Sequence, residues 1–375
     1  MLKVLTVFGT RPETIKMAPL IAELQRHPEL IDNRNCLTGQ HKDMVAPLID
    51  LFGINIDYDL QLMRNNQTLE HITITVLREV GKILREEDYD LLLVQGDTTT
   101  SMAAALAAFY AGVKIGHVEA GLRTFDKQHP YPEESNRKII DSIADLFFAH
   151  SDRAKRHLLN EGIAEEMIAV TGNTVIDALM DVSARSIDLP QSPLRDIQFD
   201  SRRVVLVTAH RRESFGGPFE SICKGLATLA QRYADDIELV YPVHLNPNVQ
   251  NVVSRYLVDI PNVRLLEPLD YLPLVQLMKR SHIVLTDSGG LQEEAPSLGK
   301  PVLVMRKVTE RQEGVEAGTL KLVGMDENDI VREASLLLDD PARYKEMSTK
   351  INPYGDGTAS IKIVKKILNS LESVC

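Results

Sequence analysis

Short apolar runs alternate with segments of helical periodicity along most of the chain. In the first half, six apolar runs have the length of buried strands: residues 3–8, 35–38, 90–94, 114–118, 146–149 and 168–171. Between them, four stretches repeat apolar residues at helical spacing: 12–26, 68–86, 98–110 and 134–144. Strands that alternate with helices are typical of a parallel sheet covered by helices. The pattern therefore predicts an α/β fold, with Thr98 as the N-cap of one helix.

A polar segment interrupts this alternation at residues 186–202, where Pro190 and Pro193 break the pattern. We interpret it as a linker between an N-terminal domain, 1–185, and a second domain, 203–357. The second series has five strand candidates: 203–208, 237–241, 263–266, 282–286 and 301–304. A last periodic run, 358–371, predicts a C-terminal helix.

The composition allows two domains and excludes several kinds of partner. The chain has 375 residues, is 44% hydrophobic and carries a net charge of −11 without a long basic run. That charge argues against nucleic acid or an anionic membrane as the main partner, but leaves a small anionic ligand open. The three cysteines are too widely spaced for a disulfide framework or a metal motif. No apolar run approaches the ~18 residues of a membrane span, so we expect a cytoplasmic protein.

Polar and glycine-containing motifs follow five of the predicted strands, at 9–13, 96–100, 117–123, 209–213 and 287–290. Ligands of parallel α/β sheets bind beyond the carboxyl ends of the strands. The last motif places Ser288, Gly289 and Gly290 at a helix N-terminus, where backbone N–H groups favour an anion such as a diphosphate. Glu294, with Glu293, could then accept hydrogen bonds from a ribose. The alternative is a helix cap with exposed acids.

Several acids and histidines in these motifs could carry acid–base chemistry. Asp97 follows a buried strand, although it could simply cap a helix, and Glu119 has an apolar setting, although it could pair with Arg123 or Arg137. Glu133 follows a stiff Pro-Tyr-Pro turn.

The basic candidates are open to two interpretations as well. His210 could donate a proton or contact a phosphate, or be an ordinary loop histidine, and His244 is similar. Arg11 and Lys16 could bind a diphosphate or be solvated. The chain lacks metal-ligand spacing and a dinucleotide fingerprint, so we expect neither a metal nor NAD.

Together the motifs strongly resemble the non-hydrolysing UDP-N-acetylglucosamine 2-epimerases. The matching stretches run nearly end to end: 4–13, 96–100, 116–124, 132–137, 171–178, 208–213, 242–247, 286–301, 309–311 and 352–357. The resemblance implies two Rossmann-like domains in the GT-B arrangement, with a cleft between the domains and the C-terminal helix (358–375) packing back on the first. It also implies a cytoplasmic homodimer that makes UDP-N-acetylmannosamine for surface polysaccharides without a cofactor.

The resemblance assigns roles residue by residue. Asp97, Glu119 and Glu133 become the catalytic carboxylates, with His210 assisting at the diphosphate. The UDP site maps onto seven residues: Arg11, Lys16, Ser288, Gly289, Gly290, Glu294 and Arg311. A second, activating UDP-N-acetylglucosamine site would use Gln40, His41, Gln67 and His244.

The sequence departs from the family pattern at three places. Asn66 stands where an arginine is common in the activating site, and Lys307-Val308 and Gln312 flank the 309–311 motif. Three alternatives stay open: a GT-B glycosyltransferase, a hydrolysing epimerase, or a catalytically silent UDP-sugar sensor.

Overall fold

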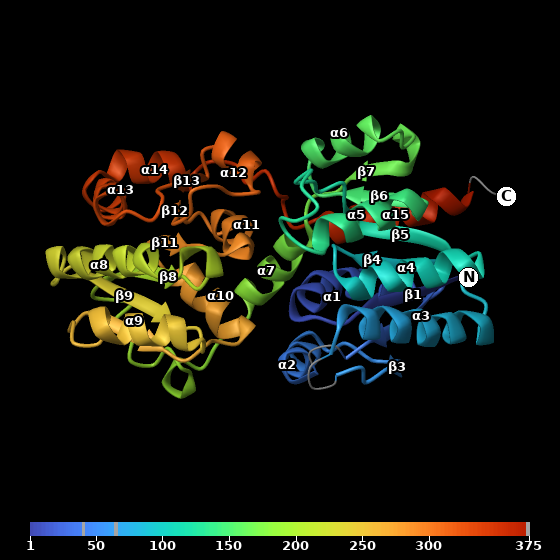
Figure 1. Cartoon of the computed structure of the whole chain (residues 1–375), viewed down its shortest axis with the longest axis horizontal. Coiled ribbons are helices and arrows are strands. Elements are labelled where there is room, and N and C mark those ends of the chain that lie inside the picture. Colours follow the sequence, from blue (N-terminus) through green and yellow to red (C-terminus); the bar gives the residue numbers. More distant parts are fainter. Residues whose placement is uncertain (40–41, 64–66, 373–375) are drawn as a thin grey trace. The chain divides into compact units, whose positions relative to one another are not determined.

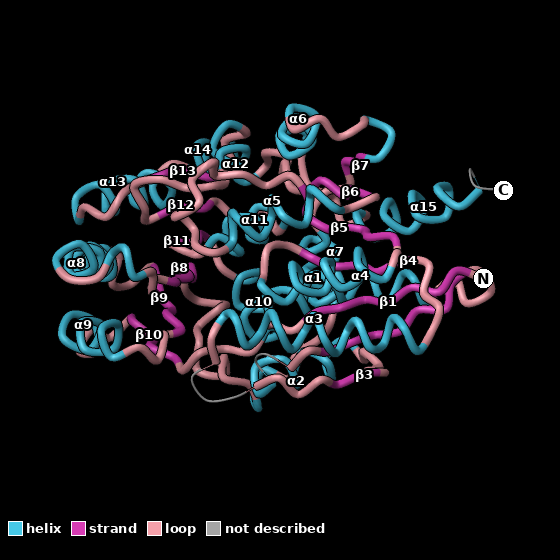
Figure 2. Tube along the Cα trace, turned by 45° about the vertical axis from the view of Figure 1, so that its right-hand side comes forward, coloured by secondary structure: helices cyan, strands magenta, loops and turns pink. Residues whose placement is uncertain are grey.

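The structure is a computed structural model that describes residues 1–39, 42–63 and 67–372. The chain forms two compact units, Met1–Ala178 with Tyr354–Cys375, and Leu179–Pro353 (Figure 1). Each unit contains one parallel sheet flanked by helices (Figure 2). The prediction of two parallel-sheet α/β domains is therefore confirmed. Among the described helices, none is both long and apolar enough to cross a membrane.

The first unit has a seven-stranded parallel sheet in the order β3-β2-β1-β4-β5-β6-β7. Its strands are β1 (Leu2–Phe8), β2 (Ile31–Leu37), β3 (Tyr58–Asp59), β4 (Leu91–Gln95), β5 (Lys114–Ala120), β6 (Leu146–Ala149) and β7 (Ile168–Val170). Its helices are α1 (Arg11–Gln25), α2 (Lys42–Phe52), α3 (Leu69–Glu86), α4 (Thr99–Ala111), α5 (Glu133–Ile143), α6 (Asp152–Asn160) and α15 (Ala359–Glu372), with a 3-10 turn, η1 (Glu165–Met167). Helix α7 (Thr174–Ala184) begins in this unit.

Strand β1 contributes apolar side chains to two core layers, one on each face of the sheet. Val4 and Phe8 pack with residues of α1 and α15, whereas Leu5 and Val7 pack with residues of α3 and α4. Successive side chains of a strand point to opposite faces, so a strand that is apolar at both sets of positions needs helices on both sides.

The C-terminal helix α15 is attached to the first unit by a buried carboxylate. Asp177 accepts hydrogen bonds from the backbone N–H groups of Ala359 and Ser360, at 3.2 and 2.7 Å. A backbone hydrogen bond of 2.7 Å from Asn173 N to Tyr354 O joins the same two segments. These bonds satisfy N–H groups that the first turn of a helix otherwise leaves without partners.

The second unit has a six-stranded parallel sheet in the order β10-β9-β8-β11-β12-β13. Its strands are β8 (Arg203–Thr208), β9 (Ile237–Pro242), β10 (Val263–Leu266), β11 (Ile283–Thr286), β12 (Val302–Val304) and β13 (Leu320–Leu322). Its helices are α8 (Gly217–Arg232), α9 (Pro247–Leu257), α10 (Tyr271–Arg280), α11 (Gly289–Ser297), α12 (Gln312–Glu316), α13 (Glu327–Asp339) and α14 (Pro341–Ser348), with 3-10 turns η2 (Leu189–Gln191) and η3 (Arg212–Ser214).

The polar segment 186–202 belongs to the second unit, and the division of the chain falls earlier, inside α7. Leu194 and Ile197 are buried, and the N–H of Gln198 donates to a carboxylate oxygen of Glu238 at 2.6 Å. The segment is therefore packed against its own unit. The sequence pattern predicted a linker here because prolines and polar residues dominate the segment, and the two buried apolar side chains do not form a periodic run.

Candidate active site

In the first sheet, β1 has β2 on one side and β4 on the other, so the strand order reverses there and the loops after β1 and β4 lie next to each other. Glu13 joins these two loops and is 1% exposed. One of its oxygens accepts from the backbone N–H groups of Gly9 and Thr10, at 3.1 and 2.7 Å. The other accepts from the hydroxyls of Thr98 and Ser101, at 2.6 and 2.9 Å.

Glu119 lies at the end of β5 in an unusual backbone conformation. Its φ is +67°, and the pairing of β5 with β6 shifts between Val118 and Ala120. Non-glycine residues rarely adopt positive φ, and a bulge re-aims a side chain at the end of a strand. The Glu119 carboxylate binds the ammonium group of Lys16 and the side-chain amide of Gln95. The alternative partners considered from the sequence, Arg123 and Arg137, are bound elsewhere.

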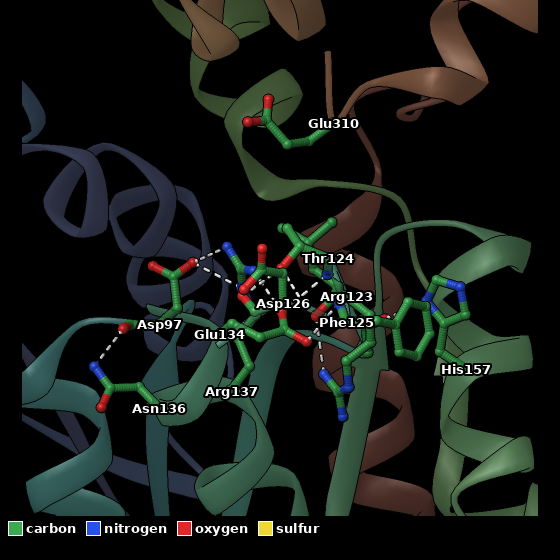
Figure 3. Close-up of polar contacts among 12 residues, drawn as sticks. Asp97, Arg123, Thr124, Phe125, Asp126, Glu134, Asn136, Arg137, His157 and Glu310 are labelled. Carbon is green, nitrogen blue, oxygen red and sulfur yellow. Dashed lines mark hydrogen bonds and ion pairs between the residues drawn. The ribbon is translucent and has the colours of Figure 1, made fainter. Parts of the chain in front are cut away.

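Asp97 is fixed by helix α5, as Figure 3 shows. Arg137 donates to one oxygen of the Asp97 side chain from Nε and Nη2, at 2.9 and 2.6 Å. Asn136 donates to the Asp97 carbonyl at 2.8 Å. The helix cap that Asp97 could have formed is instead made by Thr98, which accepts from Ser101 N at 3.0 Å. The Asp97 side chain is 28% exposed and remains accessible.

Two further carboxylates lie in the first turn of α5. Glu134 is buried and accepts from the backbone N–H groups of Thr124 and Phe125, at 2.9 and 3.0 Å, and from Arg137 at 3.1 Å (Figure 3). Glu133 differs, because one of its oxygens is buried without a hydrogen-bond partner among the described residues. A carboxylate oxygen in that state can accept a proton or a hydrogen bond from a ligand.

In the second sheet the strand order reverses between β8 and β11. Asp287, at the end of β11, is buried and accepts from the backbone N–H groups of His210 and Arg211, at 2.6 and 2.7 Å. Its other oxygen is 3.7 Å from His210 Nδ1. The imidazole of His210 stacks on that of His244 with 5.1 Å between ring centroids. Burial is the main cause that lowers the pKa of His210, which favours a neutral ring that can exchange a proton.

The N-terminus of α11 has the features expected of an anion site. Ser288 is the N-cap residue, and its side chain makes no capping hydrogen bond. A Cβ atom added at Gly289 would lie 3.3 Å from the guanidinium carbon of Arg311, so this cation lies beside the start of the helix. Arg311 Nε donates to Glu293 at 2.8 Å. Backbone N–H groups, the helix dipole and a held guanidinium together favour a phosphate group.

The proposed ribose-binding residue, Glu294, is 5% exposed. One of its oxygens accepts from the hydroxyl of Tyr271, at 2.7 Å. This tyrosine begins α10, and the sequence pattern did not indicate a role for it. The second carboxylate oxygen of Glu294 lies near Gly290, since a Cβ atom added at Gly290 would be 3.5 Å from it.

The predicted activating site lies only partly within the described residues. Gln40, His41 and Asn66 lie outside the described residues, while Gln67 and His244 lie in the first and second units respectively. Among the described residues, no cluster of three or more histidine, cysteine or acidic side chains has an arrangement suited to a metal ion.

Comparisons with known proteins identify the family. The model of the UDP-N-acetylglucosamine 2-epimerase family matches residues 22–368. The chain belongs to this family. A probable UDP-N-acetylglucosamine 2-epimerase of Ralstonia nicotianae is 52% identical over 98% of this chain and 99% of its own length. The UDP-N-acetylglucosamine 2-epimerase of Escherichia coli K12 is 50% identical over 98% of this chain and 99% of its own length.

Solved structures of the UDP-N-acetylglucosamine 2-epimerase family have the same fold. A crystal structure from Neisseria meningitidis, bound to UDP-GlcNAc, has a TM-score of 0.90, is 47% identical and covers 98% of this chain and 100% of its own. A putative enzyme from Listeria monocytogenes has a TM-score of 0.93, is 42% identical and covers 99% and 97% of the two chains. The resemblance seen in the motifs is therefore confirmed.

Within this epimerase-family chain, several residues support the site through contacts that were not foreseen from the sequence, although Arg137 was considered as a partner of Glu119 and Glu134 was noted as an acid near the loops. They hold the predicted site residues in place and are Glu13, Gln95, Glu134, Arg137, Tyr271 and Asp287. Only Glu13 had a local signal, because a Thr-x-x-Glu sequence at a helix start predicts a capping box, which is present.

Proposed function

We propose that the chain catalyses the reversible epimerisation of UDP-N-acetylglucosamine at C2 of the sugar, giving UDP-N-acetylmannosamine. The observation that carries the proposal is the pair of anchored carboxylates at neighbouring strand ends, Asp97 held by Arg137 and Glu119 held by Lys16. Membership of the family and the relative bound to UDP-GlcNAc support the substrate. A relative from Methanocaldococcus jannaschii, 32% identical with a TM-score of 0.79, is described in complex with UDP-GlcNAc and UDP.

The chemistry explains why the site needs both acids and cations. No carbonyl group activates the C2 proton, so its direct removal would leave an unstabilised carbanion. Elimination avoids this: a base takes the C2 proton, the C–H electron pair forms the C1–C2 double bond, and the C1–O bond breaks to release UDP. The intermediate is 2-acetamidoglucal. Addition of UDP back to C1, with protonation of C2 on the opposite face, inverts C2 and balances the reaction.

The proposal assigns a role to each predicted site residue. Asp97, Glu119 and Glu133 act as the proton-transferring groups. In the second unit, residues 288–290 with Arg311 and His210 stabilise the charge that develops on the departing diphosphate, and Glu294 holds the ribose. Arg11 and Lys16 complete the cationic groups, with Lys16 also neutralising Glu119.

We further propose that the enzyme is a homodimer of the cytoplasm that supplies a precursor of surface polysaccharides. Apolar side chains on the outer faces of α3 and α4 support the dimer, since Ile74, Phe109 and Tyr110 are 61%, 55% and 70% exposed. Large apolar side chains that are exposed on neighbouring helices are candidates for burial in an interface.

Incubation of the chain with UDP-N-acetylglucosamine in deuterium oxide tests the proposal. We expect UDP-N-acetylmannosamine to accumulate, with solvent deuterium at C2 of both sugars, in the absence of NAD and metal. Deuterium-free transfer of the sugar to an acceptor would indicate a glycosyltransferase. Net release of free N-acetylmannosamine would indicate a hydrolysing epimerase, and binding without turnover would indicate a sensor.

A further inference from the structure

His117 lies in the middle of β5 and is completely buried, yet both nitrogens of its ring are hydrogen-bonded. Nδ1 lies 2.6 Å from a carboxylate oxygen of Asp141, and Nε2 lies 2.7 Å from the carbonyl oxygen of Gly96. The His117 side chain is 0% exposed and the Asp141 side chain is 1% exposed. The proposed mechanism uses neither residue.

The partners of the ring determine its protonation state. A backbone carbonyl can only accept a hydrogen bond, so Nε2 must carry a proton. Burial alone would raise the pKa of Asp141, but the net shift is downward. Independently of His117, the guanidinium of Arg123 and the backbone N–H of Gly121 both donate to the other oxygen of Asp141, which stabilises its ionised form. Asp141 is then an ionised carboxylate, which also only accepts, so Nδ1 must carry a proton as well.

The surrounding charges balance only if the ring is cationic. The other oxygen of Asp141 accepts from Arg123 Nη2 at 2.7 Å and from Gly121 N at 3.2 Å. Arg123 also donates to both oxygens of Glu161, at 2.8 and 2.6 Å. The network therefore has two carboxylates and one guanidinium, and a protonated His117 supplies the second positive charge. Buried ions are tolerated when they are paired in this way.

We infer that His117 is an imidazolium and acts as a positioning residue, which holds the Gly96 carbonyl and thereby the orientation of Asp97. Gly96 precedes Asp97 directly and has a φ of +70°, so rotation of its peptide would re-aim the carboxylate. Arg137 and Asn136 hold Asp97 from helix α5, whereas His117 holds the preceding carbonyl from the sheet. The inference rests on the proposed function through the catalytic role of Asp97.

The first test measures the nitrogen chemical shifts of the histidine rings in ¹⁵N-histidine-labelled protein at neutral pH, with His117 assigned by its loss in His117→Gln. We expect both nitrogens of His117 to show the similar shifts of a doubly protonated ring. A neutral tautomer, with one protonated and one unprotonated nitrogen, would overturn the inference. This measurement needs no enzymatic activity, so it is independent of the proposed function.

The second test is kinetic. In the His117→Gln protein a single side-chain amide replaces the two ring N–H donors. Its oxygen would face either Asp141 or the Gly96 carbonyl, both of which are acceptors. The Gly96 carbonyl should therefore lose its fixed orientation. We expect kcat to fall by about 10- to 100-fold, KM to change by less than about 3-fold, and UDP affinity to stay unchanged. The matched control is His27→Gln. His27 follows the C-terminal end of α1, and its ring also lies near a carboxylate, at 3.5 Å from Glu23.

A double-mutant cycle separates positioning of Asp97 from a general structural role. In an Asp97→Asn background, His117→Gln should cost less than about 3-fold in kcat. An equal cost in both backgrounds would overturn the inference. If His117→Gln fails to fold, Glu161→Gln replaces it, because the Glu161 side chain is 34% exposed at the outer end of the network.

For Glu161→Gln we expect kcat to fall by about 2- to 5-fold at unchanged KM, whereas an unchanged kcat would contradict the inference. A wild-type protein without epimerase activity would overturn the proposed function and with it the positioning role. The ¹⁵N signals would still decide whether His117 is an imidazolium.

Discussion

Arg137 donates from Nε and Nη2 to the same oxygen of Asp97, at 2.9 and 2.6 Å. The planar guanidinium offers its donors in a fixed fork, so this contact sets both the position and the rotation of the carboxylate. The same side chain reaches Glu134 at 3.1 Å, and Glu134 in turn holds the backbone of Thr124 and Phe125 (Figure 3). One arginine thus links a candidate catalytic acid to the loop that precedes α5.

We expect Asp97→Asn and Glu119→Gln each to lower turnover by roughly 100-fold or more, because a general acid or base typically contributes 10²–10⁴-fold. Turnover of UDP-N-acetylglucosamine and the melting temperature would be measured together. Glu79→Gln is the control, since Glu79 is a partly exposed carboxylate of α3 that pairs with Arg78. Near wild-type turnover in either variant would make that carboxylate structural.

Replacement of Glu294 by alanine should weaken UDP binding. A hydrogen bond that involves a charged group contributes about 1.5–3 kcal/mol, so affinity should fall by roughly 10- to 150-fold in calorimetry. Tyr271→Phe, which removes the hydroxyl that donates to Glu294, should have a smaller effect in the same direction. Glu346→Ala, an exposed acid on α14, is the control. Unchanged UDP affinity in Glu294→Ala would place the nucleotide elsewhere.

The sequence predicted the fold well where the apolar pattern was long. The strand predicted at 146–149 is β6 (Leu146–Ala149), the helix at 68–86 is α3 (Leu69–Glu86), and Thr98 is an N-cap as expected. The two-residue strand β3 and the three-residue strand β13 were missed. A two-residue strand shows no periodicity. In β13 the charged Lys321 separates Leu320 from Leu322, whereas the equally short β7 (Ile168–Val170) and β12 (Val302–Val304) have consecutive apolar residues and were predicted.

The site was harder to predict, because its partners come from distant parts of the chain. Lys16 and Glu119 are 103 positions apart, yet they form an ion pair. A sequence shows that a lysine and a glutamate follow strand ends, but not which cation meets which anion. Asp287 illustrates the same limit: its role is to hold the backbone of His210 and Arg211, 77 and 76 positions away.

Asp177→Ala should destabilise the first unit. Asp177 accepts from two N–H groups at the start of α15 and is buried, so its removal leaves buried donors without acceptors, at a cost of about 1–3 kcal/mol. Urea denaturation measures the change, and hydrogen exchange should increase in α15. The matched control is Asp356→Ala, which removes an exposed carboxylate that bonds Thr358 near the same helix start. Equal effects of the two substitutions would contradict a special role for Asp177.

His282 should make the stability of the second unit depend on pH. The imidazole stacks on Tyr344 with 4.1 Å between ring centroids. Burial, followed by the charges of Arg203 and Lys300, lowers its pKa to about 4. The unfolded chain takes up this proton near the ordinary histidine pKa of about 6.5, whereas the folded chain does so only near 4. Between these values the unfolded state binds more protons, so stability falls as the pH falls from about 6.5 toward 4.

The test of this dependence is His282→Phe, which keeps an aromatic ring against Tyr344 but cannot be protonated. Between pH ~7 and ~5, the free energy of unfolding of the wild type should drop by on the order of 1 kcal/mol more than that of the variant, after allowance for partial solvent exposure. Urea denaturation at both pH values measures the difference. His27→Phe is the control, because its ring is 33% exposed beside Glu23. Identical pH dependence in the wild type and His282→Phe would show that His282 is protonated equally in both states.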